Sequence, residues 1–370
     1  MIARSVFPGR YVQGYKALDR LGSELARFGK RGLSILAPSA YKSLSGSLQG
    51  RSPAVRMEVE PFNRECCEPE IERLLTRAKE CRCEFIVAVG GGKAIDTGKI
   101  VADRLNVPVA VVPTIASTDA PCSSCAVVYN EKGAVVSIAY QRRNPDLVLV
   151  DTDIIARAPV RFLVSGMGDA LATWFEAESC RRSMSNNEVG EKGSMTAYAL
   201  ARLCYDTLLE YGVSARISCE AKSVTPALEH IVEANTLLSG LGFENGGLAS
   251  AHSIHNGLTT LPQTHRFFHG EKVTVGLLTS LFLTDKPKSL IDEVFAFCES
   301  VGLPTTLAEV GLIDVSRKDL QKAAERACMD GESIHKEADE VTPELIVSAM
   351  LTADGAGRRR KGVEPQNYNH

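Results

Sequence analysis

Short hydrophobic runs alternate with longer amphipathic stretches over the first 160 residues of the chain. The runs are four or five residues long and rich in β-branched side chains, which favours buried strands. They are Leu33–Leu36, Val55–Val59, Phe85–Val89, Val109–Val112 and Leu147–Val150. Helical periodicity extends between them over residues 18–28, 68–81 and 94–105. This alternation predicts parallel strands joined by right-handed crossovers, and therefore an open α/β sheet covered by helices.

The hydrophobic pattern changes after Pro159, where long helical stretches begin to dominate. Before that point, two β-rich runs at residues 126–129 and 134–139 flank a turn sequence and predict a hairpin added to the sheet. A chain of 370 residues also exceeds what one hydrophobic core usually organises. We therefore expect an α/β domain of mostly parallel sheet over residues 1–160 and an all-α domain over residues 161–370.

Composition places the chain among ordinary globular proteins, with 44% hydrophobic and 24% charged residues. The formal net charge of −3 argues against a nucleic-acid or anionic-membrane partner. The one basic run, Arg358–Lys361, is typical of a solvated helix end. No signal-peptide core or membrane span stands out, so we expect a cytoplasmic protein. The eleven cysteines, an odd number, favour reduced thiols over a disulfide framework.

A glycine triplet, Gly90-Gly91-Gly92, joins the buried run 85–89 to the next helical stretch. Glycines let a backbone approach a phosphate closely, and a helix N-terminus offers N–H groups and partial positive charge. A second loop, which contains Thr114, Ser117 and Asp119, follows the next strand and is expected at the same sheet edge. The two loops together favour a dinucleotide site. A triplet used only for the steric needs of a sharp turn is the alternative.

Two histidines and an aspartate in the second half of the chain are candidate ligands of one divalent metal. His252 lies in a segment of small and apolar residues, where an unpaired imidazole would be costly. His269 follows two phenylalanines, and Asp169 stands after a glycine-containing segment at the expected start of a helix. Two imidazoles and a carboxylate leave a coordination position open, as in catalytic zinc sites. Taken singly, each histidine can be a hydrogen-bonded core residue, and Asp169 can be a helix N-cap.

Six motifs together resemble the glycerol dehydrogenases of the iron-containing alcohol dehydrogenase superfamily. They are Gly90–Thr97, Pro113–Cys122, Gly168–Glu176, Gly242–Ala249, Ala251–Gly257 and His269–Lys272, and they extend over most of the chain. The resemblance implies the dehydroquinate synthase-like fold, with an active site in the cleft between a nucleotide-binding domain and a helical domain. It implies metal-dependent, NAD-linked oxidation of glycerol or a related vicinal diol to a hydroxyketone such as dihydroxyacetone. It also implies a homo-oligomer, often an octamer.

The resemblance assigns roles residue by residue. Zinc, or else Fe²⁺, would be held by Asp169, His252 and His269, which would thereby also bind the substrate. Asp119 would contact the substrate, and His255 would relay a proton through water or only support the neighbouring ligand. The cofactor contacts implied are Gly91, Gly92, Lys93, Asp96, Thr114, Ser117 and Tyr129.

One position departs from the family pattern. Family members commonly carry an acidic residue after the first strand, where it binds the adenosine ribose hydroxyls and repels a 2′-phosphate. The corresponding stretch here is Leu36-Ala37-Pro38-Ser39, which has no carboxylate. We therefore expect NAD to be preferred over NADP only weakly. A lyase resembling dehydroquinate synthase, or a glycerol-1-phosphate dehydrogenase, would share the fold but should show more basic residues in these motifs. A metal-stabilised scaffold or binding protein is the alternative from another class.

Overall fold

A parallel six-stranded sheet forms the centre of the N-terminal half of the chain. The computed structural model describes residues 2–50, 54–131, 133, 135–364 and 368. The strand order is β1-β8-β5-β4-β2-β3, and all five neighbouring pairs are parallel. The strands are β1 (Tyr11–Gly14), β2 (Arg31–Leu36), β3 (Arg56–Pro61), β4 (Phe85–Gly90), β5 (Val109–Pro113) and β8 (Leu147–Asp151). The five predicted strands are confirmed. The sixth, β1, escaped prediction because it is short and half polar.

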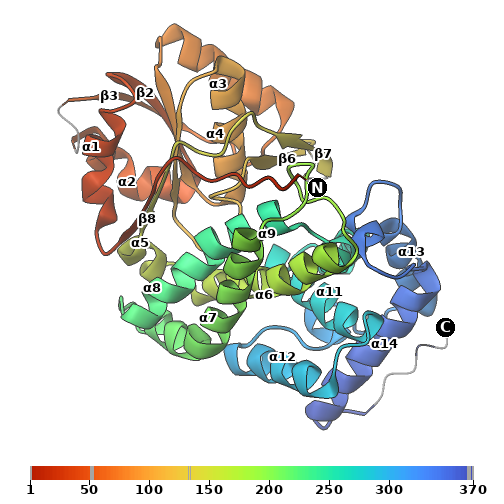
Figure 1. Cartoon of the computed structure of the whole chain (residues 1–370). Coiled ribbons are helices and arrows are strands. Elements are labelled where there is room, and N and C mark those ends of the chain that lie inside the picture. The colour runs from red at the N-terminus through yellow and green to blue at the C-terminus, as the bar shows by residue number, and fades with distance from the viewer. Residues whose placement is uncertain (1, 51–53, 132, 134, 365–367, 369–370) are drawn as a thin grey trace. The chain divides into compact units, whose positions relative to one another are not determined.

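Helices cover both faces of this sheet, as Figure 1 shows. The helices are α1 (Leu21–Leu25), α2 (Pro38–Gly50), α3 (Glu68–Glu80) and α4 (Gly92–Leu105). Alternate side chains of β4 separate the faces, because Phe85, Val87 and Val89 share a hydrophobic core with residues of α1 and α2. On the other face Gly98 of α4 packs so closely that a Cβ there would lie 2.4 Å from the Cβ of Ala88. The segment predicted as helix 18–28 forms only a 3₁₀ turn and α1.

The predicted hairpin forms, but its addition to the main sheet was wrong. Strands β6 (Cys125–Tyr129) and β7 (Val135–Tyr140) make a separate antiparallel two-stranded sheet. Strand β5 is already paired on both sides, with β4 and β8, so β6 cannot pair with the strand that it follows in the chain. Instead, the N–H of Val127 donates to the Asp96 carboxylate and the N–H of Tyr129 donates to the Cys66 carbonyl. Ala134, which the prediction included, lies outside the described residues.

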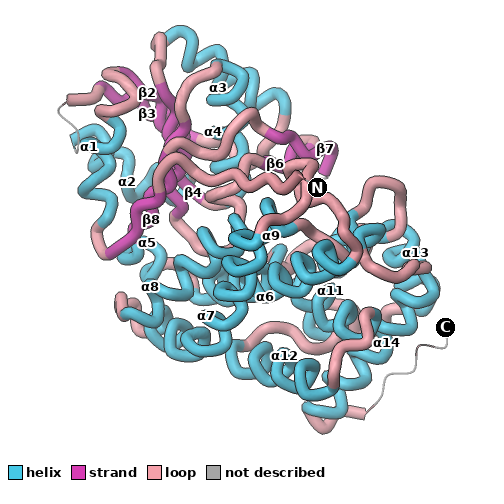
Figure 2. Tube along the Cα trace, viewed as in Figure 1, coloured by secondary structure: helices cyan, strands magenta, loops and turns pink. Residues whose placement is uncertain are grey.

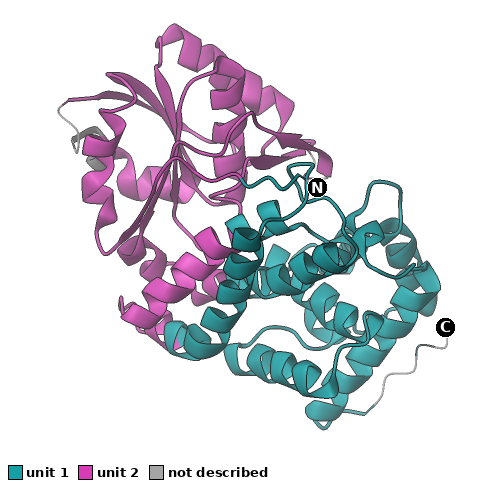
Figure 3. Cartoon of the chain, in the orientation of Figure 1, with its two compact units in different colours: residues 1–5, 164–216, 241–370 teal, residues 6–163, 217–240 magenta. Residues whose placement is uncertain are grey.

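Contacts divide the chain into two compact units, which Figure 3 colours separately. Unit 2 comprises residues 6–163 and 217–240, and it contains the sheet together with α5 (Thr152–Arg157) and α8 (Pro226–Glu233). Segment 217–240 belongs to this unit because its side chains bind the sheet. Glu229, for example, accepts hydrogen bonds from Gln13 and Thr152. A single domain boundary near residue 160 stays a prediction.

Unit 1 comprises residues 1–5, 164–216 and 241–370, and it is helical, as Figure 2 shows. Its helices, some of which begin or end beyond the unit, are α6 (Val160–Arg182), α7 (Met195–Glu220), α9 (Ser239–Gly246), α10 (Ser250–Leu258), α11 (His269–Leu283), α12 (Lys288–Val301), α13 (Arg317–Ala327) and α14 (Pro343–Arg360). Helices α10 and α11 pack closely, because a Cβ on Gly276 would lie 2.2 Å from the Ala251 carbonyl oxygen. None of the helices in the described residues is long and apolar enough to cross a membrane.

The basic C-terminal run is exposed as predicted at Arg359, Arg360 and Lys361, but not at Arg358. Arg358 at the end of α14 is largely buried and donates to Asp354, with its Nε 2.6 Å from the carboxylate. Arg360 pairs with Glu299 at 2.8 Å. The Arg360–Glu299 pair therefore ties the last helix to α12, whereas the Arg358–Asp354 pair lies within α14 itself and lets Arg358 stay near the core at lower cost.

Candidate metal centre and nucleotide cradle

Asp169 lies fully buried in the interior of α6, well inside the helix. The predicted helix start at this residue was wrong, since α6 already begins at Val160, and the N-cap alternative falls with it. The preceding Gly168 serves packing, because a Cβ there would lie 2.6 Å from the carbonyl oxygen of Gly270 at the start of α11. The small residue lets α11 approach α6 closely, and this approach brings His269 next to the carboxylate.

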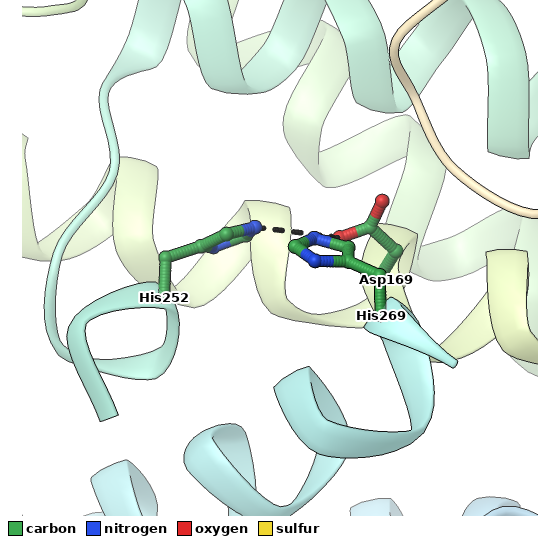
Figure 4. Close-up of side chains that lie close together, drawn as sticks. All are labelled: Asp169, His252 and His269. Carbon is green, nitrogen blue, oxygen red and sulfur yellow. Dashed lines mark ion pairs between the residues drawn. The ribbon is translucent and has the colours of Figure 1, made fainter. Parts of the chain in front are cut away.

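The two histidines come from the first turns of two other helices, α10 and α11. The Nε2 atoms of His252 and His269 lie 3.3 Å and 3.1 Å from the same oxygen, Oδ1 of Asp169. The three potential ligand atoms lie within 4.8 Å of one another. Figure 4 shows the imidazoles directed toward the carboxylate. The three residues grouped from the sequence therefore lie together, in an arrangement that fits one divalent ion, while their role as ligands stays a prediction.

Burial and charge act strongly on these groups. Burial alone favours the neutral form of Asp169, but the neighbouring His269 and His252 imidazoles lower its pKa far below the usual range. Burial likewise opposes protonation of His252, but the carboxylates of Glu176 and Asp169 outweigh it and raise the pKa of His252 well above its usual value. Strong mutual perturbation of buried groups is typical of functional sites. A cation at this position would replace the protons that otherwise hold the cluster together.

His255 forms a chain of hydrogen bonds that leads away from His269. Its Nε2 lies 3.1 Å from Nδ1 of His269, and its Nδ1 lies 3.1 Å from Oδ1 of Asn256. The Asn256 amide in turn donates to Glu332 at 2.9 Å, and Glu332 pairs with Arg326. Burial, followed by the positive charge of His269 and Lys272, lowers the pKa of His255 well below its usual value. The geometry gives His255 a supporting contact, while its proton-relay role stays a prediction.

Glu176 was missed as a site residue by the sequence analysis, although it closes the motif Gly168–Glu176. Its buried carboxylate lies 2.6 Å from Nδ1 of His252. The available signal was its spacing of seven residues from Asp169, which is two helical turns and places both acids on one face.

The glycine triplet stands between β4 and α4 as predicted. Gly91 occupies the N-cap of α4 and offers no side chain to its first N–H groups, while Gly92 is the first helical residue. A Cβ on Gly92 would meet only Oγ1 of Thr118, at 3.9 Å. Gly90, by contrast, has a φ of +155°, and a Cβ there would lie 2.6 Å from the Cβ of Ala37. Gly90 is thus required by the turn itself, whereas the space above Gly92 is open to an anion.

The triplet also lies at the switch point of the sheet. Helices α2 and α4, which follow the neighbouring strands β2 and β4, cover opposite faces, and the carboxyl ends of two such strands are where open α/β sheets bind their ligands. The loop after β5 lies at the same edge, because the N–H of Thr114 donates to the Gly90 carbonyl at 3.0 Å. Ala37 and Pro38 follow β2 here, as expected for residues near an adenosine ribose. Thr114 and Ser117 are half-buried beside the cradle.

Three predicted cofactor residues already have protein partners. Asp96 is buried and accepts from the Val127 N–H at 3.0 Å and from Lys99 Nζ at 3.4 Å. Burial raises the pKa of Asp96 despite that lysine. Lys93 pairs with Glu65 at 2.8 Å and lies 4.4 Å above the ring centroid of Tyr129. These contacts order the ends of α4 and β6, and direct contact with a cofactor stays a prediction for each.

Asp119 is buried in the loop after β5 and accepts a hydrogen bond from the Ser239 hydroxyl at 2.9 Å. The same loop is held at Ala116, whose carbonyl accepts from Nδ2 of Asn235 at 3.0 Å. Asn235 belongs to a π-helical segment, Ala234–Leu238, of a kind that is frequent at functional sites. Asn235 and Ser239 carry no local signal of this role in the sequence, because their partners lie more than a hundred residues away.

Comparisons with known proteins agree with this arrangement. The sequence model of the family "Iron-containing alcohol dehydrogenase" matches residues 8–152. A glycerol dehydrogenase of Thermotoga maritima is 57% identical over 98% of this chain and 100% of its own length. A glycolaldehyde reductase of Halobacterium salinarum is 43% identical over 96% of this chain and 98% of its own length. The crystal structure of a probable glycerol dehydrogenase from Sinorhizobium meliloti superimposes with a TM-score of 0.92 at 43% identity, covering 97% of this chain and 100% of that one.

Proposed function

This chain belongs to the iron-containing alcohol dehydrogenase family, and from that premise we propose that it oxidises glycerol, or a closely related vicinal diol, with NAD as hydride acceptor. The observation that carries the proposal is the convergence of Asp169, His252 and His269 on one point. Relatives named glycerol dehydrogenase support the substrate. The product would be dihydroxyacetone or the corresponding hydroxyketone.

The metal would be held by the Asp169 carboxylate and by Nε2 of His252 and of His269. When bound, a divalent ion supplies a Lewis acid that polarises a substrate hydroxyl and makes its proton easier to remove. The protein's own contribution is orientation. The His269 side chain is 35% exposed, so one side of the cluster stays accessible to a small molecule. Zinc and ferrous iron both suit two imidazoles and a carboxylate, and zinc is our choice because the donor set matches catalytic zinc sites.

The cofactor would be carried by the cradle at the sheet edge. Gly91, Gly92 and the first N–H groups of α4 would bind the pyrophosphate, with Lys93, Asp96, Thr114, Ser117 and Tyr129 as further proposed contacts. Asp119 is our proposed substrate contact, because Ser239 holds its carboxylate in one orientation.

A divalent ion with three protein ligands would have room for two substrate oxygens if it became five-coordinate, so it would suit substrates with two neighbouring hydroxyls. The name of the Halobacterium relative, glycolaldehyde reductase, points to a smaller molecule with the same pattern. We therefore propose vicinal hydroxyls, rather than glycerol alone, as the feature that the site recognises. The lyase and glycerol-1-phosphate alternatives are not favoured, because the closely matching relatives are dehydrogenases and reductases of small polyols and aldehydes.

Initial rates would test the proposal directly. NAD and NADP are each combined with glycerol, 1,2-propanediol, 2,3-butanediol, ethylene glycol and 1,3-propanediol, and NADH with dihydroxyacetone and glycolaldehyde. We expect vicinal diols to be oxidised and 1,3-propanediol to react at least tenfold more slowly. Equal rates with 1,2- and 1,3-propanediol would contradict the recognition of neighbouring hydroxyls, and no turnover with any diol would contradict the function.

The oligomeric state is also a proposal. Family resemblance favours a homo-oligomer, and an octamer in particular. Light scattering coupled to size-exclusion chromatography would measure the native mass, and a mass equal to that of one chain would contradict it.

A further inference from the structure

The carboxylate of Glu176 makes three hydrogen bonds at the start of α10. Its Oε1 accepts from the backbone N–H groups of Ala249 and His252, both at 2.9 Å. Its Oε2 lies 2.6 Å from Nδ1 of the His252 ring. The side chain is only 2% exposed, so these contacts are made away from water, where charge-assisted hydrogen bonds are strong. A buried carboxylate thus forms hydrogen bonds with both the backbone and the ring of one candidate metal ligand.

This contact determines which nitrogen of His252 carries the proton. An ionised carboxylate only accepts hydrogen bonds, so the Nδ1 that faces Glu176 must be the donor. A neutral imidazole then keeps the lone pair on Nε2, and Nε2 is the atom that faces Asp169 at 3.3 Å. The ring is therefore both oriented and held in the tautomer that binds a metal. His269 is supported differently, because its Nδ1 meets the neutral ring of His255 at 3.1 Å.

Charge gives a second argument. Asp169 and Glu176 project from the same face of α6, two turns apart, and both are almost completely buried. Their two formal negative charges equal in size the charge of a divalent cation held by neutral imidazoles. Without Glu176, the same buried cluster would carry a net positive charge, which is costly in a low-dielectric interior.

We propose that Glu176 is the positioning residue of the metal centre, which fixes His252 in its metal-binding tautomer and orientation and raises the affinity for the ion. The inference rests on the proposed function, since it presumes that Asp169, His252 and His269 hold a metal. Removal of such a supporting partner typically lowers metal affinity ten- to a hundredfold. The effect acts through His252, and Glu176 itself touches no substrate.

The chain offers a matched control in Glu337. This carboxylate is also buried and also binds the start of α10, where it accepts from the backbone N–H of Ser250 at 3.1 Å and from the Ser250 hydroxyl. Among the described residues, its hydrogen bonds at this helix start go to Ser250 and not to the His252 ring. Glu176→Gln and Glu337→Gln therefore weaken the same helix start, but only the first changes the group that faces the imidazole. In Glu176→Gln, an amide that keeps its oxygen on the backbone turns its NH₂ toward Nδ1, which favours the wrong tautomer.

The experiment measures the zinc affinity of the full-length enzyme. The enzyme is incubated with increasing concentrations of a chelator, and the zinc that remains bound per chain is then determined. Thermal unfolding of each variant in excess zinc shows whether it is folded. We expect zinc affinity to fall ten- to a hundredfold in Glu176→Gln and to stay within about threefold of the wild type in Glu337→Gln. The cobalt-substituted Glu176→Gln enzyme should also show a shifted visible absorption band, because the ligand field at the ion changes.

Each outcome separates the two proposals. Wild-type enzyme that holds no stoichiometric zinc would overturn the proposed metal centre, and with it the function. Stoichiometric zinc in the wild type with unchanged affinity in Glu176→Gln, or with equal losses in both variants, would overturn only the role of Glu176. If Glu176→Gln fails to fold, Glu176→Asp keeps the charge but is one methylene too short for all three contacts. Its zinc affinity should fall at least threefold, and an unchanged value would overturn the inference.

Discussion

The metal cluster of unit 1 and the glycine cradle of unit 2 are built in opposite ways. The cluster consists of side chains: Asp169 is buried, His252 is mostly buried, and each has defined polar partners. In the cradle, the absence of side chains matters, since neither Gly91 nor Gly92 places one over the first N–H groups of α4, and the space above Gly92 is open. This difference predicts which substitutions each site should tolerate. Replacement of a single ligand atom in the cluster should abolish activity. The cradle should lose cofactor affinity only when a larger side chain is introduced at a glycine.

The largest expected effect comes from removing a ligand atom of the cluster. Asp169→Asn or His269→Ala should lower kcat/KM for glycerol by roughly a thousandfold or more, which corresponds to about 4 kcal/mol of transition-state stabilisation. NADH binding, measured by fluorescence, should persist because the cradle belongs to the other unit. Removal of metal by a chelator should abolish activity in the same way, and added zinc should restore it. Undiminished turnover by the metal-free enzyme would show that the cluster has no catalytic role.

A smaller effect is expected when a single methyl group is added to the cradle. Gly92→Ala should raise the KM for NAD by roughly tenfold, because the methyl group enters the space proposed for the pyrophosphate. Stability should stay the same or rise by up to about 1 kcal/mol, since alanine favours a helix more than glycine does. Steady-state kinetics and thermal unfolding measure the two quantities separately.

Gly90→Ala is the control for this comparison. Its φ of +155° and the nearby Cβ of Ala37 mean that alanine at residue 90 should destabilise the fold. We therefore expect loss of stability at residue 90 and loss of affinity at residue 92. An unchanged KM for NAD in a stable Gly92→Ala enzyme would show that the open glycine serves only the turn.

The choice between NAD and NADP tests the adenosine end of the cradle. The packing of Ala37 against Gly90 leaves little room for a larger side chain, so Pro38, the first residue of α2, is the better place for a ribose-binding acid. Pro38→Asp should raise the ratio of NAD to NADP efficiency by roughly tenfold, or about 1.4 kcal/mol. Ala37→Asp should give a smaller gain and a lower melting temperature. If the unaltered enzyme already rejected NADP by many thousandfold, another residue would have to bind the ribose.

The smallest effect is expected from a charged side chain at the cradle. Lys93 is already paired with Glu65, and its side chain is 42% exposed. A half-exposed charged contact contributes roughly 0 to 1 kcal/mol, and we expect the proposed contact of Lys93 with the cofactor to be of that size, so Lys93→Met should raise the KM for NAD by less than about fivefold. A loss of a hundredfold or more would mean that Lys93 leaves Glu65 for the cofactor, and it would make the cradle depend on a side chain as the metal cluster does.

Several features of this protein could be predicted from the local pattern of its sequence. The five buried strands, the glycine turn after Phe85–Val89 and the three metal-ligand candidates are all confirmed in place, although the ligand role itself stays a proposal. These features could be predicted because a buried strand, a glycine turn and a candidate histidine ligand are each indicated by residue type and by neighbouring residues in the sequence. Histidine is especially informative here, since the chain has only seven.

The tertiary structure alone decided which distant groups support these residues. The chain has 45 acidic residues, and no local pattern distinguishes the one that holds Nδ1 of His252, from 76 positions away, from the many that lie at the surface. Packing likewise placed Asp169 inside α6, separated the β6–β7 hairpin from the main sheet and joined segment 217–240 to the sheet. The physical reason is common to all of these. Residue type and spacing act locally along the chain, whereas the partner of a buried polar group is set by which helices approach closely enough to exclude water.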